Sequence, residues 1–318
     1  MEKTVRETIK ETIFNHLKKN NGLIFGQCLS AVGWVGGTLP ELTENDGLIE
    51  LSMADVANGG IVAGAGLSNR RPIYVIRYQG FNWFNAPIIL NYACKSKEIW
   101  NVPCPIFIRG IGMEGSIGPV AGSSHHSLYY RMPGIKIISP MTPKEYLLAY
   151  NYFMKNNDVL YVSEHRGSYS NKDELSDFIS KDLDIILFPI SITRFEAQKA
   201  KIELEKKGYK IGIGNIVWIK PFEIKKEWEN AVKSSKFGGI VLDDDYPQGV
   251  AANLAYEMMK KTGKKIDVLG LKNKSAGFSK ATDNLPPSYL EIVEKVEEIV
   301  KTNRKWKNCL NDNNENTI

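Results

Sequence analysis

Residues 54–76 read ADVANGGIVAGAGLSNRRPIYVI, a run of small residues followed by a β-rich segment. Small residues dominate 55–68, and we expect a buried helix there, because small side chains let another backbone or a flat ligand approach closely. The segment Pro72–Ile76 is rich in β-branched and aromatic residues, which favour strands. The stretch therefore predicts a helix followed by a strand, the repeating unit of an α/β protein.

The same alternation continues on both sides of this stretch. An amphipathic helix is expected over 3–19 and a short buried strand over 22–26. Further on, the pattern predicts strands at 105–108, 135–138 and 159–162 and helices at 83–98 and 143–155. Strands that alternate with helices indicate an α/β fold with a doubly wound parallel sheet, covered by helices on both faces.

A polar, turn-rich segment at 171–184 marks a domain boundary. A smaller alternation follows, with strands expected at 185–189, 209–218, 239–242 and 266–269 and helices at 194–207, 224–234, 249–261 and 288–301. We therefore expect one domain over 1–180, a second, smaller α/β domain over 181–303, and a loose polar tail over 304–318.

Composition and charge exclude several classes of protein. With 318 residues, 43% of them hydrophobic, the chain has material for packed cores and is neither disordered nor fibrous. Its net charge is only +5 and its charges are interspersed, so we expect no nucleic-acid partner. No apolar run reaches the roughly 18–20 residues that span a bilayer, so we expect no membrane association. The four cysteines form no CxxC pair and no secretory signal is visible, which favours a cytoplasmic protein.

Several common catalytic motifs are incomplete in this sequence or absent from it. Residues 110–115 contain GxGxxG after a strand, but 116–124 is not helical and no acidic residue occurs between Glu114 and Glu145. A dinucleotide site is therefore not expected. The motifs of P-loop enzymes, α/β-hydrolases and zincins are also absent from the sequence.

Two adjacent histidines, His125 and His126, follow the glycine-rich segment 110–122. Ligands commonly bind in loops that follow the strands of an open α/β sheet, and histidine transfers protons near neutral pH. We expect a functional site here. The alternative is that either histidine is capped or packed in the core.

Four segments carry a family resemblance. Residues 54–72 follow, at the same spacing, the family pattern TEMGFAGIAVGAALAGxRP. The segment HHS at 125–127 corresponds to QHS in the family, and PGIKIISPMTP at 133–143 corresponds to PGLKVVxPxxP. The pair Glu164-His165 corresponds to an EH pair that follows a strand. Together, over about residues 3–301, they resemble the beta subunit of the decarboxylating component of 2-oxoacid dehydrogenases. That subunit is the pyrimidine-binding half of thiamine diphosphate enzymes related to transketolase. The resemblance implies a pyrimidine-binding domain followed by a smaller domain of the transketolase C-terminal type.

The resemblance also implies chemistry through an enamine on thiamine diphosphate, activated by a carboxylate that binds the aminopyrimidine ring. It places Asp55 on the family's glutamate, one methylene shorter, as a catalytic and cofactor-binding residue. Two alternatives remain for Asp55. The side chain contacts the cofactor without activating it, or it serves only as the N-cap of helix 55–68.

Further site residues follow from the same resemblance. Tyr78, Phe81 and Phe84, spaced three apart, are expected to bind the aminopyrimidine ring, with core packing as the alternative. His126 is expected to face the thiazolium and substrate as a hydrogen-bond or proton donor. His125 replaces the family's glutamine and is expected either to bind a substrate group or to point away.

The family's diphosphate motif, GDG with a downstream asparagine that holds Mg²⁺, is absent; the Asn45-Asp46-Gly47 tripeptide precedes the Asp55 segment. We therefore expect no metal site in this chain. Thiamine diphosphate is expected to be shared with an alpha-type partner that carries Mg²⁺, in an α2β2 heterotetramer acting on a small-molecule substrate. The favoured function is 2-oxoacid decarboxylation. The alternatives are half of a split transketolase, which moves a ketol unit, and a regulatory subunit that has lost the activation step.

Overall fold

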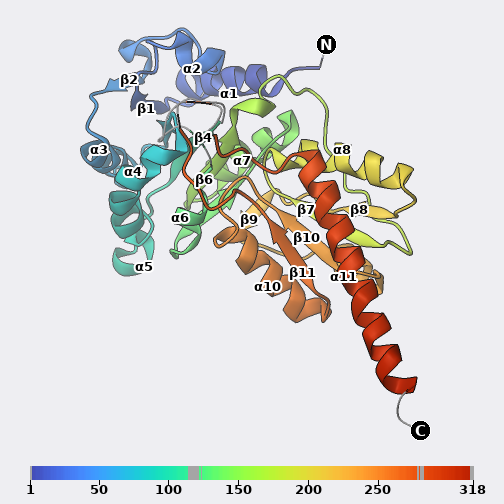
Figure 1. Ribbon diagram of the computed structural model, residues 1–318. Helices are drawn as coiled ribbons and strands as arrows, with labels where there is room; N and C mark the ends of the chain where they lie inside the picture. Colours follow the sequence, from blue (N-terminus) through green and yellow to red (C-terminus); the bar gives the residue numbers. More distant parts are fainter. Residues whose placement is uncertain (1, 114–121, 123, 278, 280–282, 316–318) are drawn as a thin grey trace.

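The chain folds around two sheets, as the computed structural model shows (Figure 1). The structure describes residues 2–113, 122, 124–277, 279 and 283–315, with side chains up to residue 302. Within these residues, the large sheet has the strand order β2-β1-β3-β4-β6-β5-β9 and the small sheet the order β11-β10-β7-β8.

The strands of the large sheet come mostly from the first half of the chain. They are β1 (Leu23–Gln27), β2 (Leu48–Leu51), β3 (Pro72–Ile76), β4 (Ile106–Gly112), β5 (Ile135–Ile138), β6 (Val159–His165) and β9 (Trp218–Lys220). Those of the small sheet are β7 (Ile185–Pro189), β8 (Ile211–Ile213), β10 (Gly239–Leu242) and β11 (Ile266–Leu269). Neighbouring strands are parallel throughout, apart from β9, which pairs antiparallel with β5.

The helices fill the connections. The α-helices are α1 (Val5–Lys19), α2 (Gly33–Gly37), α3 (Asp55–Leu67), α4 (Asn82–Ile88), α5 (Ser96–Trp100), α6 (Ser127–Tyr130), α7 (Pro143–Lys155), α8 (Thr193–Lys206), α9 (Lys226–Ser234), α10 (Val250–Thr262) and α11 (Tyr289–Glu315). Short 3₁₀ turns are η1 (Glu44–Asp46), η2 (Gln79–Phe81) and η4 (Arg166–Ser168), and η3 (Ile89–Ala93) is a π-helix. Within the described residues, no helix is both long and apolar enough to cross a bilayer.

Helices cover both faces of the large sheet, which confirms the expected doubly wound α/β architecture. One face packs on α1 and α7 through a cluster that includes Ile9 and Phe153. The other face packs on α3 and η3 through Val62 and Ile89, and the same cluster continues into the small sheet at Phe188. The two sheets thus share one apolar core, so groups at their adjoining ends are held in fixed relation.

Three elements differ from the sequence-based expectation. The strand expected at 209–218 is two strands, β8 and β9, which belong to different sheets. The helix expected over 83–98 breaks into α4, the π-helix η3 and α5, because Pro87 lacks the N–H that a regular helix needs. Finally, α11 runs through the polar stretch that we expected to be a loose tail, and Figure 1 shows it extending away from the body.

A buried ion pair joins β4 to β6 at the centre of the large sheet. Arg109 Nε and Nη2 donate to the two carboxylate oxygens of Glu164 at 2.7 and 2.8 Å. The hydroxyl of Tyr169 also donates to Glu164, and Arg109 donates a further bond to Thr38. Burial alone lowers the pKa of Arg109, but the charge of Glu164 outweighs it, so the pKa is raised and the guanidinium stays charged.

Removing one member of this pair is expected to destabilise the fold strongly. Glu164→Ala leaves the Arg109 charge buried without its partner, which costs about 3–5 kcal/mol of the free energy of unfolding. Urea denaturation measures the change. The double variant Arg109→Met/Glu164→Leu removes both charges and is expected to recover most of the loss; equal destabilisation of single and double variants would contradict this account.

Candidate functional site

A small cavity lies where β1 and β3 end and α3 begins. Its volume is about 130 Å³, and the expected site residues Asp55, Tyr78 and Phe81 all line it. The remaining lining residues are Gln27, Cys28, Met53, Tyr74, Val75, Ile76, Arg77 and Asn85. Carboxyl ends of parallel strands are where ligands bind in open α/β sheets.

Asp55 is held in this cavity by Asn85. Asn85 Nδ2 donates to Asp55 Oδ1 at 2.9 Å and to the Phe81 carbonyl at 3.0 Å, while the hydroxyl of Tyr74 donates to Asn85 Oδ1. Burial, and then the negative charge of Asp55, raise the pKa of Tyr74, so its hydroxyl remains a donor. Tyr74 therefore positions Asn85, and Asn85 in turn orients the Asp55 carboxylate.

The N-cap interpretation of Asp55 finds no support in this geometry. Helix α3 is capped by Ala54, which provides no side-chain hydrogen bond, and Asp55 is the first helical residue. The side chain turns to Asn85 instead. Its position at the helix N-terminus still favours a negative charge there.

The three aromatic residues form a row that leads out of the cavity. The ring centroids of Tyr78 and Phe81 lie 6.2 Å apart, and those of Phe81 and Phe84 lie 6.5 Å apart. Tyr78 and Phe81 line the cavity, whereas Phe84 does not and is 50% exposed on the surface of α4. Tyr78 and Phe81 therefore give the cavity aromatic walls, and the exposed Phe84 lies beside Phe81 outside it.

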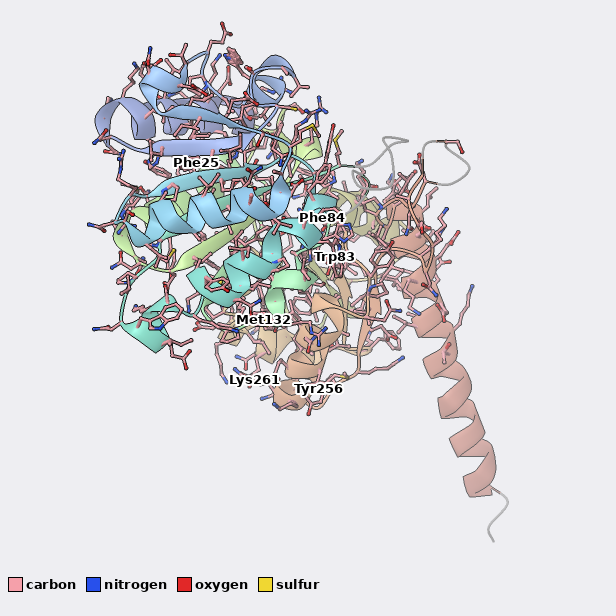
Figure 2. All side chains as sticks on the ribbon, turned by 90° about the vertical axis from the view of Figure 1, so that its left-hand side faces the viewer. Phe25, Trp83, Phe84, Met132, Tyr256 and Lys261 are labelled. Atoms are coloured by element: carbon pink, nitrogen blue, oxygen red, sulfur yellow. The ribbon has the colours of Figure 1, made fainter. Side chains whose placement is uncertain are left out.

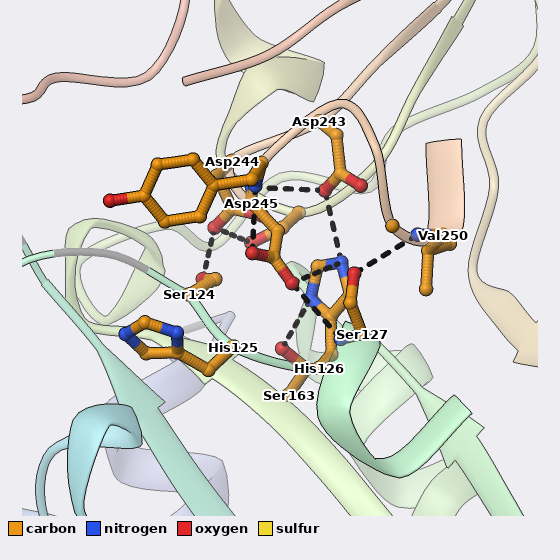
Figure 3. A network of polar contacts seen from close by, with 12 residues as sticks. Ser124, His125, His126, Ser127, Ser163, Asp243, Asp244, Asp245 and Val250 are labelled. Atoms are coloured by element: carbon orange, nitrogen blue, oxygen red, sulfur yellow. Dashed lines mark hydrogen bonds and ion pairs between the residues drawn. The ribbon is translucent and has the colours of Figure 1, made fainter. Parts of the chain in front are cut away.

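His125 lies on the same side of the molecule as this aromatic row. Its ring contacts Trp83, the neighbour of Phe84, with centroids 6.3 Å apart, and its backbone N–H donates to buried Gln79 at 2.6 Å. Burial lowers the pKa of His125 and outweighs the opposing charge of Asp245, so neutral imidazole is favoured. Figure 3 shows the ring pointing away from the aspartate network described next.

His126 occupies a different environment from the one we expected. Its imidazole is fully buried, lies 3.0 Å from Asp243 Oδ1 and 3.9 Å from Asp245 Oδ2, and contacts the Ser163 hydroxyl through Nδ1 at 3.2 Å (Figure 3). Burial alone lowers the pKa of His126, but the charges of Asp243 and then Asp245 and Asp244 outweigh it and raise the pKa to about 10. The structure thus separates His126 from the residues that line the Asp55 cavity.

The residues that hold Asp55 and those that surround His126 were not expected from the sequence. Nothing in the motif pattern identified Asn85 or Tyr74, although Asn85 follows Phe81 by one helical turn. The run Asp243–Asp245 carried a usable signal, since it follows directly after a predicted strand, where polar residues of α/β proteins gather. Most of the glycine-rich segment 110–122 lies outside the described residues.

A larger cavity, of about 490 Å³, lies elsewhere, between the edge of the large sheet and α9. Trp218, Phe222 and Trp228 line it, and none of the expected site residues does. The chemistry expected from the sequence therefore belongs to the smaller cavity.

Comparison with known proteins gives consistent results. Residues 2–172 match the family model of the transketolase pyrimidine binding domain. Among curated relatives, the pyruvate dehydrogenase E1 component subunit beta of Bacillus subtilis (strain 168) is 24% identical over 94% of this chain and 98% of its own. That of Staphylococcus aureus (strain COL) is 21% identical over the same shares.

Among solved structures, a split gene transketolase, described as an inactive beta4 tetramer, superposes with a TM-score of 0.71 at 12% identity. The match covers 95% of this chain and 99% of that one, and at this identity it establishes a shared fold. Because the family model spans more than half of the sequence, the chain belongs to the transketolase pyrimidine binding domain family.

Proposed function

We propose that this chain is the beta-type subunit of a heteromeric thiamine diphosphate enzyme that decarboxylates a 2-oxo acid. The observation that carries the proposal is the Asp55 carboxylate, fixed by Asn85 in a small cavity with aromatic walls. The names of the curated relatives support the choice of 2-oxo acid over ketose. The likeness to a split transketolase concerns the fold alone and does not favour ketol transfer.

The described residues fit the aminopyrimidine end of the cofactor. Asp55 supplies a carboxylate, and Tyr78 and Phe81 supply apolar ring surface, as a flat aromatic ring with polar edges requires. When bound, the cofactor supplies a carbon centre that adds to a carbonyl group and stabilises the negative charge that follows. The task of Asp55 is then to hold or exchange a proton at the ring, and Asn85 keeps its carboxylate oriented.

The cavity is too small to hold the whole cofactor. Its volume of about 130 Å³ is well below the roughly 300–1,000 Å³ typical of sites that enclose a small molecule. We infer that an alpha-type chain provides the diphosphate and Mg²⁺ site. The stoichiometry that follows from the resemblance is α2β2.

An exposed apolar face beside the cavity supports such a partner. Figure 2 looks onto this face, with Trp83 and Phe84 near each other on α4. Other large apolar side chains exposed on α3 and its neighbours are Met53, Val56, Ile61 and Tyr92. The elements that carry these side chains pack against one another, and exposed apolar residues concentrated in this way are typical of protein–protein contact. His125, beside Trp83, would then face the shared site and contact the substrate, whereas His126 would act from behind it.

Loss of the Asp55 charge is expected to slow turnover by about a hundredfold or more. Asp55→Asn keeps the size of the side chain and its contact with Asn85, so the assembled enzyme should still bind cofactor. Asp55→Glu is also expected to reduce activity, because the extra methylene overpacks a small cavity.

Steady-state kinetics of the enzyme reconstituted with the alpha-type chain measures both variants. Asp173→Asn, an exposed aspartate outside the site, is the matched control. Full activity of Asp55→Asn would remove Asp55 from the reaction.

The exposed face predicts a selective effect on assembly. Phe84→Ser removes apolar surface beside the cavity and is expected to weaken association with the alpha-type chain at least tenfold, as loss of a buried aromatic anchor does. Phe14→Ser is the control, since Phe14 is 43% exposed on α1, which covers the opposite face of the large sheet. Sedimentation analysis of each variant mixed with the alpha-type chain measures the affinity of the two chains. Equal weakening by Phe84→Ser and Phe14→Ser would contradict the assigned interface.

A further inference from the structure

A buried cluster of an imidazole and carboxylates lies between the two sheets, outside the Asp55 cavity. His126 immediately precedes α6, and Asp243, Asp244 and Asp245 follow β10 of the small sheet. All four side chains are almost completely buried. One potential ligand atom each from His126, Asp243 and Asp244 lies within 4.8 Å of the other two.

Three atoms of this cluster are buried without a hydrogen-bond partner among the described residues. They are His126 Nε2, Asp243 Oδ2 and Asp244 Oδ1. His126 Nε2 lies 3.0 Å from Asp243 Oδ1 as an ion pair, so the two carboxylate oxygens are the atoms without any partner in the part of the chain that the structure describes. Leaving a buried polar atom unsatisfied costs roughly 1–3 kcal/mol, and more for a charged group, so these two oxygens point to a missing partner.

The other atoms of these side chains are held in place by neighbouring groups. Asp244 Oδ2 accepts hydrogen bonds from Ser124 at 2.6 Å and Ser191 at 2.7 Å. Ser163 contacts His126 Nδ1, so a proton on Nδ1 would leave Nε2 with a free electron pair directed at the carboxylates. Such outer contacts are typical of metal ligands, whose orientation they fix.

The charges of the cluster also favour a cation. Three carboxylates lie near two imidazoles, since His165 as well as His126 acts on Asp244, so even two imidazolium groups would leave the ionised cluster negative. A divalent ion supplies two positive charges and lets the imidazole stay neutral.

We propose that His126, Asp243 and Asp244 bind one divalent transition-metal ion of the Zn²⁺ or Mn²⁺ type. A mixed set of imidazole nitrogen and carboxylate oxygen suits these ions, whereas Mg²⁺ and Ca²⁺ prefer oxygen alone. The 3.0 Å between His126 Nε2 and Asp243 Oδ1 matches the roughly 3.0–3.4 Å that separates neighbouring ligands about 2.1 Å from one ion. The three proposed ligands do not line the Asp55 cavity, and a metal at this place was not expected from the sequence.

The ion would join the two sheets at a place where they already meet closely. Ser127 Oγ accepts from the N–H of Val250, the first residue of α10. A Cβ at Gly249 would lie only 2.0 Å from Ser127 Oγ, so this approach requires glycine. A metal bound here clamps the loop that carries His125 to the small sheet.

Metal binding by the purified full chain tests the proposal. After removal of bound metal with a chelator, calorimetric titration with Zn²⁺ and with Mn²⁺ is expected to show one ion per chain, with much weaker binding of Mg²⁺. Asp243→Asn should weaken Zn²⁺ binding more than about a hundredfold, beyond the 10–100-fold effect of residues that only support ligands. Asp267→Asn, a partly buried aspartate on the neighbouring strand β11, should leave binding unchanged.

A second measurement decides the question if Asp243→Asn does not fold. Pulsed electron paramagnetic resonance of the wild-type chain with Mn²⁺ is expected to show coupling to a directly bound imidazole nitrogen, lost in His126→Gln. Absence of that coupling in the wild-type chain, or equal Zn²⁺ affinity of the wild-type, Asp243→Asn and Asp267→Asn proteins, would overturn the proposal.

Discussion

Parallel pairing of β1, β3, β4 and β6 is the constraint on which the site depends, because it brings the carboxyl ends of all four strands to one edge. Cys28 follows β1 there, Arg77 and Tyr78 follow β3, and His165 ends β6. The buried pair of Arg109 and Glu164 fixes β4 against β6 close to that edge. Segments far apart in the sequence therefore meet at one place, and contacts such as that between His125 and Gln79 join them further.

Small residues in α3 allow this helix to pack closely against α4 beside Asp55. A Cβ at Gly59 would lie 3.2 Å from the carbonyl of Asn85, so a larger residue would push α4 away from α3. Close packing of these two helices is what lets Asn85 reach Asp55. The run of small residues and the acid at its start thus act together, as parts of one site.

Much of this was predictable from the sequence. Alternating patterns revealed the doubly wound sheet, and the motif around Asp55 and the spacing of Tyr78 and Phe81 identified side chains that do share a cavity. Local patterns could not reveal that β9 joins the large sheet, because its partner β5 lies some eighty residues earlier in the chain. The burial of His126 was hidden for the same reason, since the aspartates that surround it come from the small sheet.

The central claim is that this chain holds only the pyrimidine half of a cofactor site. Calorimetric titration of thiamine diphosphate with Mg²⁺, into the chain alone and into its complex with an alpha-type chain, tests that claim most directly. We expect weak or undetectable binding to the chain alone and tight, Mg²⁺-dependent binding to the complex. Tight Mg²⁺-dependent binding to the isolated chain would contradict it.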